Sequence, residues 1–453
     1  MLNYLLNILQ IVDFHLLSTY NGNMKKQYNR LMEPYLQTLM QEFPAIAVEG
    51  LKGVGKTVST KKLATTVFEL DRPKDFDQVT NIANLLLSEP TPVLIDEWQR
   101  VPSVWDIVRR AVDDDAKPGT FLLTGSTANT DTNIHSGAGR IIRRRMYPLS
   151  FAERELAEPT VSIKDMFSVS KSFELGISGT TDFSPSQYIV EIAASGLPEF
   201  RRLSIENRNI TFESYFENML SHEFIQQGIR LRQPATLLRW LRAYAAAIST
   251  DAGYNEILDV STAGEGNKPA AKTTIAYREA LENLWLVDEL QPWTGGEAYF
   301  SGLKMSPKHY LADPAFAVYL LGLDEKIMTG TSGWPNLAER FDAKYGSILG
   351  RLFEALVHLS LNTYVTVNNA KLYYLKTYKG DHEIDFILQK GSKVIACEVK
   401  FSPTAAPSDG RHLKWLRDKL GNDCCDAMII TTGSVAYRRN DGIAVIPAAL
   451  LTA

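Results

Sequence analysis

The pattern of apolar and polar residues predicts an N-terminal part in which strands and helices alternate. Short apolar runs at 41–50, 66–71, 91–97 and 119–126 predict buried strands. The residues between these runs have helical spacing, so a helix is expected to connect each strand to the next. Alternation of this kind is typical of a parallel α/β sheet with helices on its faces. The pattern fades after about residue 155.

Helical patterns dominate the middle of the chain. Residues 213–227 predict a strong helix, and two further helices are expected at 235–248 and 272–287. Short β-type runs follow the last of these and end at KHYLADP (308–314). Two helices followed by a hairpin predict a winged-helix domain, and a plain helical connector is the alternative.

The last part of the chain predicts a different order: helix, hairpin, helix, strand. Its hairpin lies at 382–401, where two apolar runs flank a Gln-Lys-Gly-Ser turn. The fold class is therefore multidomain α/β. The expected parts are an N-terminal extension (1–23), a parallel-sheet P-loop domain (24–157), a helical connector or lid (158–230), a winged-helix-like domain (231–322) and a C-terminal α/β domain (340–453).

A phosphate-binding motif follows the first predicted strand. The segment GLKGVGKT at 50–57 fits G-x-x-x-x-G-K-[ST] and stands between a strand and a helix, as this motif requires. Its glycines let backbone N–H groups surround phosphates, the lysine can reach the β- and γ-phosphates, and the threonine hydroxyl can bind Mg²⁺. The nucleotide-binding residues predicted here are Gly50, Gly53, Gly55, Lys56 and Thr57.

Acidic and hydroxyl residues at the ends of two later strands complete this site. Asp96 ends the strand VLID and is expected to help hold Mg²⁺. Glu97 comes next and is a candidate for orienting or activating the attacking water, with a solvated loop acid as the alternative. Ser126 ends FLLTGS and could sense the γ-phosphate, although a simple turn is nearly as good an interpretation.

An arginine-rich segment follows, and two interpretations of it stay open. Arg140 lies in GAGR, where flanking glycines allow a loop to present it to the γ-phosphate. An arginine there would stabilise the charge of the transition state. Together with the arginines at 143–145, it could equally form a solvated or nucleic-acid-contacting face.

Charged residues interrupt the apolar runs of the C-terminal hairpin. Asp385 lies on its first strand, and Glu398 and Lys400 share one face of the second. Burying such charges is costly unless they are paired or bound to metal. Two carboxylates and an ammonium predict a Mg²⁺ site with an activating lysine, and Glu354, on the preceding helix, could complete the set. This is the pattern of the PD-(D/E)XK phosphodiesterase fold, and an inactive ion pair is the alternative.

Composition limits the partners and the cellular compartment that can be expected. The 453 residues carry a net charge of −4, so any contact with nucleic acid would need a local basic patch. Three cysteines provide neither a disulfide framework nor a metal-ligand spacing. The apolar N-terminus lacks a basic region and a cleavage site and is short for a membrane span. A soluble, cytoplasmic protein without membrane contact is expected.

These motifs together resemble a known family. The segments are GLKGVGKT, VLIDEWQRVP, FLLTGST, GAGR with YPLSFAE, SGLPE, KHYLADP, GRLFEALV, EIDFIL and EVKFS, spread from about residue 44 to 402. In this order they resemble the prokaryotic AAA-like ATPases that carry a C-terminal nuclease-like domain of unknown function. The resemblance implies ATP and Mg²⁺ as cofactors at the P-loop site.

Two functions follow from this sequence. The first is a Mg²⁺-dependent ATPase whose nucleotide state controls a DNA-directed, nuclease-like C-terminal module, with DNA bound through the winged-helix and nuclease-like domains. The alternative is a nucleotide-dependent binding switch with an inactive nuclease-like domain that holds nucleic acid or a protein. A homo-oligomer is a further expectation, because Arg140 could act across a subunit interface.

Overall fold

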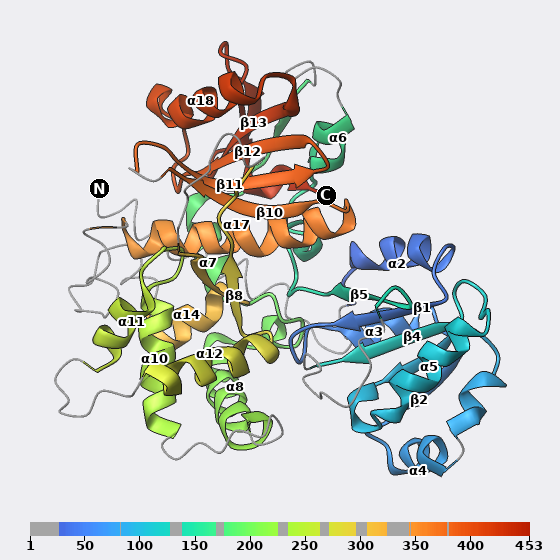
Figure 1. The fold of residues 1–453 in the computed structure, drawn as a ribbon. Helices are drawn as coiled ribbons and strands as arrows, with labels where there is room; N and C mark the ends of the chain where they lie inside the picture. Colours follow the sequence, from blue (N-terminus) through green and yellow to red (C-terminus); the bar gives the residue numbers. More distant parts are fainter. Residues whose placement is uncertain are drawn as a thin grey trace.

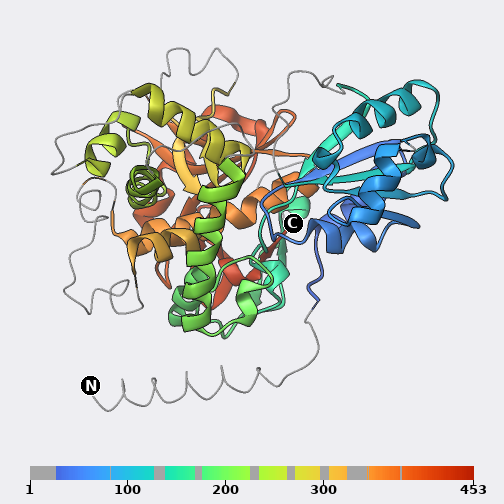
Figure 2. The ribbon, with the colours of Figure 1, turned by 90° about the horizontal axis from the view of Figure 1, so that it is seen from below.

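A computed structural model describes most of the chain (Figure 1). The blue and cyan N-terminal sheet lies beside a body made of green and yellow helices and an orange and red sheet, and Figure 2 shows the same separation from below. The predicted extension 1–23 lies outside the described residues. Within the described part, no helix is long and apolar enough to cross a membrane. The described residues are 27–81, 83–126, 138–168, 176–224, 234–262, 271–295, 306–323, 344, 346–377 and 380–453.

The N-terminal sheet has five parallel strands in the order β2-β3-β4-β1-β5. The predicted parallel α/β sheet is confirmed, and all four predicted strands are present. The fifth strand, β5, was not predicted. The elements are α2 (Met32–Met40), β1 (Ala45–Glu49), α3 (Lys56–Lys61), β2 (Thr66–Glu69), α4 (Pro73–Asn81), η1 (Ala83–Leu87), β3 (Val93–Asp96), η2 (Trp98–Arg100), α5 (Ser103–Asp113), β4 (Phe121–Gly125) and β5 (Ile141–Arg145).

Both faces of this sheet are covered. Successive residues of a strand point to opposite faces, so Ile46 and Ala47 of β1 enter different cores. Ile46 packs in the same cluster as Leu36 of α2, whereas Ala47 lies in the cluster that contains Trp105 and Val108 of α5. The carboxyl ends of the strands remain at one edge of the sheet, where the predicted site residues begin.

The middle of the chain is mainly helical. Among the described residues from 234 onward, three helices precede a two-stranded hairpin, one helix more than the sequence predicted, and the additional helix is α11. The predicted helix at 213–227 corresponds to the end of α8 and the π-helical turn η5, and its residues 225–227 lie outside the described part of the chain. The elements are η3 (Ala152–Arg154), α7 (Pro185–Ala193), η4 (Phe200–Arg202), α8 (Ile205–Asn218), η5 (Met219–Glu223), α10 (Pro234–Ala246), α11 (Tyr254–Ser261), α12 (Ala271–Asn283), β8 (Val287–Leu290), β9 (Lys308–Leu311) and α14 (Pro314–Leu321).

The C-terminal sheet has seven strands in the order β10-β11-β12-β13-β15-β14-β7. The predicted helix, hairpin, helix and strand are α17, β11–β12, α18 and β13. Residues 161–180 come from the predicted connector, yet β6 pairs with β16 and β7 pairs with β14. The elements are β6 (Val161–Ser162), α6 (Ile163–Ser168), β7 (Gly179–Thr180), α17 (Ile348–Val367), β10 (Lys371–Lys376), β11 (Glu383–Lys390), β12 (Lys393–Val399), η6 (Pro407–Gly410), α18 (Arg411–Leu420), η7 (Gly421–Asp423), β13 (Cys424–Thr431), β14 (Val435–Arg438), β15 (Ala444–Pro447), η8 (Ala448–Leu450) and β16 (Leu451–Thr452).

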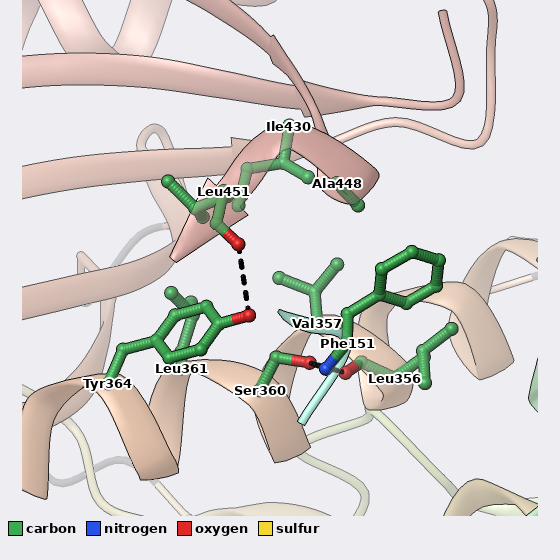
Figure 3. Close-up of a pocket in the computed structure, with 9 residues that line it drawn as sticks. All are labelled: Phe151, Leu356, Val357, Ser360, Leu361, Tyr364, Ile430, Ala448 and Leu451. Atoms are coloured by element: carbon green, nitrogen blue, oxygen red, sulfur yellow. Dashed lines mark hydrogen bonds between the residues drawn. The ribbon is translucent and has the colours of Figure 1, made fainter. Parts of the chain in front are cut away.

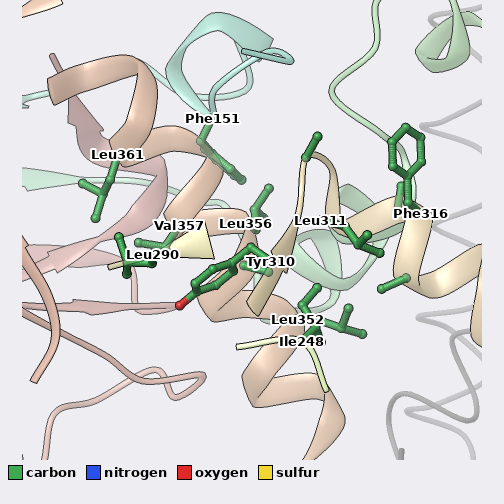
Figure 4. Close-up of a cluster of buried hydrophobic side chains, with 14 of the residues drawn as sticks. Phe151, Ile248, Leu290, Tyr310, Leu311, Phe316, Leu352, Leu356, Val357 and Leu361 are labelled. Carbon is green, nitrogen blue, oxygen red and sulfur yellow. The ribbon is translucent and has the colours of Figure 1, made fainter. Parts of the chain in front are cut away.

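Helix α17 joins the middle helices to the C-terminal sheet. In Figure 4 its residues Leu352 and Leu356 lie in one apolar cluster with Leu311 of β9 and Phe316 of α14. Because α17 is packed between the middle helices and the C-terminal sheet, 15 of its 20 residues are buried. The β8–β9 hairpin is therefore packed directly against the domain that carries the C-terminal acids.

The segment after β5 is anchored to the same helix. Figure 3 shows a narrow apolar pocket where the backbone N–H of Phe151 donates to Ser360 Oγ over 3.0 Å. Tyr364 closes its other end by donating to the carbonyl of Leu451 over 3.0 Å. The walls of the pocket are apolar side chains of the core. The hydroxyls of Ser360 and Tyr364 both have hydrogen-bond partners in the protein. The pocket therefore connects the N-terminal domain to the C-terminal sheet.

Candidate nucleotide-binding and acidic sites

The P-loop follows β1 and turns sharply into α3. Gly55, the residue before the helix, has φ 102°, a left-handed conformation that glycine adopts without strain. Gly50 lies so close to the segment after β5 that a Cβ there would be 2.3 Å from the carbonyl oxygen of Met146. Gly53, at φ 83°, occupies the turn between them. The predicted glycines thus have the backbone shapes that a phosphate-binding loop needs.

Lys56 is buried, with 5% of its surface exposed. Its Nζ donates to the carbonyls of Gly50 and Leu51 over 2.8 and 3.1 Å and to Ser126 Oγ over 3.2 Å. Burial lowers the pKa of Lys56 to about 8, although the nearby carboxylates of Glu97 and Asp96 favour the charged form. The ammonium is surrounded by mainly neutral acceptors, so an anion would be a strongly preferred neighbour.

Asp96 and Thr57 meet at the end of β3. The Thr57 hydroxyl donates to Asp96 Oδ1 over 2.7 Å, and Thr124 on β4 also donates to this oxygen. Burial raises the pKa of Asp96, whereas the hydrogen bonds from Thr124 and Thr57 lower it. A carboxylate and a hydroxyl are hard oxygen donors of the kind that Mg²⁺ prefers beside nucleotide phosphates. The two residues therefore fit the predicted magnesium ligands.

Glu97 has a left-handed backbone, with φ 53° and ψ 46°. Few residues other than glycine adopt this conformation, and those that do are often found at functional sites. Its carboxylate accepts a hydrogen bond from Ser126 Oγ over 2.8 Å and another from Gln99 Nε2. Since Ser126 also contacts Lys56, the structure brings all three predicted residues into one network.

Arg140 is not part of this network. It precedes β5, whose first residue pairs with Ala45 and whose last pairs with Glu49, next to the P-loop. The five residues of β5, or about 16 Å of strand, therefore separate it from the loop. Its Nε is 2.9 Å from Asp113 Oδ1 at the end of α5, and 49% of its side chain is exposed. The role predicted for Arg140 at a γ-phosphate stays a prediction.

Arg30 is a buried residue near the P-loop that the sequence did not reveal. Its guanidinium donates to the carbonyl of Val54 over 2.7 Å and to that of Tyr147 over 2.6 Å. Glu153 accepts from its Nε over 3.1 Å. Arg30 therefore fixes the loop against the segment after β5. No motif surrounds it, so its partners, up to 123 residues away, could not be inferred from the sequence.

The C-terminal acids converge as the sequence predicted, and we call Glu354, Asp385 and Glu398 the acid cluster. Phe386 pairs with Cys397, which places Asp385 opposite Glu398 across the hairpin. Lys400 Nζ lies 3.1 Å from Glu398 Oε2. The backbone N–H of Val399 donates to Asp385 Oδ2 over 2.9 Å.

A second lysine, which the sequence analysis did not single out, enters the acid cluster. Lys308 on β9 places its Nζ 3.1 Å from Glu354 Oε1 and 3.3 Å from Asp385 Oδ1. Tyr310, two residues further along β9, donates to the same oxygen of Glu354 over 2.6 Å. KHYLADP contained a signal for this contact, because a lysine within an apolar strand needs an acidic partner.

Electrostatics of the acid cluster follow from these contacts. Burial raises the pKa of Glu354 to about 7, against the attraction of Lys308. Burial opposes ionisation of Asp385 too, but Lys308 and Lys400 hold its pKa below the usual value. Burial and the charge of Asp385 raise the pKa of Glu398 well above its ordinary range. In the part of the chain that the structure describes, no group of three or more His, Cys, Asp or Glu residues is arranged to hold a metal ion.

A parallel sheet with a glycine-rich loop after β1 and an aspartate at the end of β3 defines a P-loop nucleotide-binding domain. Residues 42–155 match a family described as an AAA domain. Residues 186–327 and 349–451 match two families described as domains of unknown function (DUF8612 and DUF4143). The AAA match and the P-loop geometry together support ATP binding by an AAA-like ATPase domain.

Relatives cover most of the chain. It is 24% identical over 425 residues to the uncharacterized proteins Mb2031c of Mycobacterium bovis and Rv2008c of Mycobacterium tuberculosis, spanning 91% of this chain and 82% of each relative. A solved structure, the Walker-type ATPase paby2304 of Pyrococcus abyssi, aligns with 66% of this chain and 99% of its own, at 14% identity and a TM-score of 0.38.

Proposed function

We propose that this protein is a Mg²⁺-dependent ATPase whose nucleotide state controls its C-terminal module. The observation that carries the proposal is the contact network in which Ser126 links Lys56 to Glu97, beside Asp96 and Thr57. Mg²⁺ bound with the nucleotide would neutralise phosphate charge. These residues surround the space that follows the P-loop at the carboxyl edge of the sheet, where nucleotides bind in open α/β sheets.

In the proposed hydrolysis of ATP, the P-loop, Lys56 and Glu97 have distinct roles. Backbone N–H groups of the loop and the Lys56 ammonium bind the phosphates. Glu97 accepts the proton of the attacking water, and the hydrogen bonds from Ser126 and Gln99 hold its carboxylate in place. The buried surroundings of Lys56 strengthen its attraction to the phosphates, since interactions between charges are less screened there.

The test is the substitution Glu97→Gln. The amide keeps the size of the side chain but cannot accept a proton, so ATP should bind with wild-type affinity while hydrolysis slows by roughly 100-fold or more. Binding calorimetry and phosphate release would be measured on the same preparations. Glu42→Gln, at an exposed position of the same domain, is the matched control. Hydrolysis at the wild-type rate by Glu97→Gln would remove Glu97 from the mechanism.

A short series of contacts supports control of the C-terminal module by the nucleotide. A Cβ at Gly55 would lie 4.0 Å from the side chain of Pro198, so the P-loop faces the segment SGLPE. In that segment, Ser195 Oγ and the N–H of Gly196 each donate to Asp313 Oδ2 over 2.6 Å. Asp313 comes two residues after β9, the strand that carries Lys308. A shift of the P-loop on nucleotide binding therefore has a packed route to the acid cluster.

We further propose that the C-terminal module acts on DNA. Supporting this are the helix, hairpin and helix order of the PD-(D/E)XK pattern and the meeting of Asp385, Glu398 and Lys400. The three helices and hairpin of residues 234–311 are the order expected for a winged-helix domain. Incubation of plasmid and linear DNA with Mg²⁺ or Mn²⁺, with and without ATP, would test cleavage. Asp385→Ala, which removes a carboxylate, is the inactive control.

The alternative function is a nucleotide-dependent binding switch with an inactive nuclease-like domain. One observation favours it: Lys308 already neutralises two acids of the cluster. DNA retained by the full chain in an ATP-dependent manner, without cleavage under any metal condition, would select this alternative. Cleavage lost in Asp385→Ala would exclude it.

A further inference from the structure

Lys308 has an environment that needs a specific explanation. Its surface is 3% exposed, and its Nζ lies within 4 Å of three carboxylates, those of Glu354, Asp385 and Glu383. An ammonium loses several kcal/mol of hydration on burial, and only close anionic partners offset this loss. The lysine belongs to β9 of the middle region, whereas all three acids belong to α17 or β11. The contact therefore joins two parts of the chain through charge.

Donors from β9 and β12 also occupy oxygens that a metal ion would need. Glu354 Oε1 accepts from both Lys308 and Tyr310, and the two oxygens of Asp385 accept from Lys308 and from the Val399 N–H. Figure 4 shows Tyr310 directed from β9 past Leu290. Mg²⁺ demands near-octahedral oxygen ligation at about 2.0–2.1 Å, and these oxygens are turned toward protein donors instead. As arranged, the residues do not fit the metal that the PD-(D/E)XK pattern implies.

We propose that Lys308 is a built-in cation that occupies the place of a divalent metal in the acid cluster and keeps such an ion out. The ammonium lies between Glu354 and Asp385, two of the residues that the pattern assigns to the ion. A divalent ion between the same carboxylates would be repelled by the ammonium at short range. The proposal rests on the proposed metal-dependent function of the C-terminal module and specifies its regulation.

The position of β9 connects the contacts of Lys308 to the nucleotide site. The strand is held at its start by Lys308 and Tyr310 and beyond its end by Asp313, which receives two hydrogen bonds from SGLPE beside the P-loop. Movement of SGLPE would act on Asp313 and, through the short β9 strand, on Lys308. The short segment from Lys308 to Asp313 thus contacts both the acid cluster and SGLPE, which lies beside the nucleotide site.

The experiment measures binding of Mn²⁺ alone, without nucleotide or DNA, to the full chain. Lys308→Met keeps the length of the side chain and removes its charge. It should bind Mn²⁺ roughly tenfold or more tightly than wild type, because the competing ammonium is gone, and Mn²⁺ should raise its melting temperature. Lys376→Met is the matched control, since Lys376 contacts Asp251 and Glu383 but neither Glu354 nor Asp385. It should bind Mn²⁺ like wild type.

Two results would overturn the proposal. One is equal Mn²⁺ affinity in wild type and Lys308→Met, and the other is a folded Lys308→Met without any Mn²⁺ response. If Lys308→Met does not fold, Lys308→Met/Glu354→Gln removes one charge of each sign and retains Asp385 and Glu398. The same Mn²⁺ response is expected there, and its absence counts against the proposal. Metal binding by Lys308→Met without DNA cleavage would disprove the nuclease function while supporting the role of Lys308.

Discussion

Lys56 and Lys308 are both buried, but their partners give them opposite properties. Lys56 donates to two carbonyls and a hydroxyl, and burial lowers its pKa to about 8. Burial also opposes the charge of Lys308, yet Glu354 and Asp385 raise its pKa well above the ordinary value. A lysine among neutral acceptors attracts an incoming anion, whereas a lysine among carboxylates is already neutralised. Lys56 is therefore suited to bind phosphate and Lys308 to hold acids.

The substitution Lys56→Ala tests the first of these roles. It should weaken ATP binding by roughly 10- to 100-fold, since a hydrogen bond to a charged group contributes about 1.5–3 kcal/mol. Thermal melting should remain close to that of wild type, because the side chain donates to backbone carbonyls rather than filling a core. Lys74→Ala, at an exposed position on α4, is the control. Unchanged ATP affinity would contradict the assignment of the P-loop.

For single residues, the sequence was sufficient to predict site members that lie within one motif or one hairpin. Lys56, Thr57 and Asp96 follow from fixed positions after strands, and Asp385 opposite Glu398 follows from the hairpin register. Lys308 could not be placed, because its partner Asp385 is 77 residues away and the contact depends on packing between domains. The contact of Arg140 with Asp113 could not be inferred for a related reason, because β5 was not recognised.

Among elements, the strands that the sequence missed are mainly edge or short strands. Central parallel strands are buried on both faces and form continuous apolar runs, so they are easy to recognise. Strand β5 lies at an edge and reads Ile-Ile-Arg-Arg-Arg, which looks like a basic patch. In the fold, Arg143 pairs with Glu49 and Arg145 with Asp288. Long-range ion pairs therefore account for two of these charges.

One such ion pair should be essential for the C-terminal sheet. Asp426 on β13 is fully buried, and Arg438 on β14 donates to both of its oxygens over 2.8 and 2.9 Å. Arg438→Met leaves the carboxylate uncompensated and should destabilise the fold by about 3–5 kcal/mol. Arg438→Met/Asp426→Asn removes both charges and should recover much of this loss. Thermal melting compares both with Arg411→Met, at an exposed position. Equal melting of all variants would show that the pair contributes little.

For the whole molecule, the position of Arg140 limits what it can do. It lies at the end of the sheet opposite the P-loop, pairs with Asp113 and is about half exposed. An arginine so placed can reach the γ-phosphate only of another copy of the chain. Arginines supplied in this way stabilise transition-state charge in other P-loop enzymes. We therefore propose a homo-oligomer in which Arg140 of one subunit completes the site of its neighbour.

Mixing two inactive variants tests this proposal. Lys56→Ala binds ATP weakly but keeps Arg140, whereas Arg140→Ala binds ATP but lacks the arginine. Each alone should hydrolyse ATP slowly, and a mixture should regain activity, because Lys56→Ala subunits supply Arg140 to intact P-loops. Wild-type specific activity should rise with protein concentration for the same reason. The control mixture contains Lys56→Ala and Glu97→Gln subunits. Neither kind of subunit has a P-loop site with both Lys56 and Glu97, so no activity should return. If the first mixture also stays inactive while Arg140→Ala alone retains full activity, Arg140 is a surface residue and the ATPase needs no partner subunit.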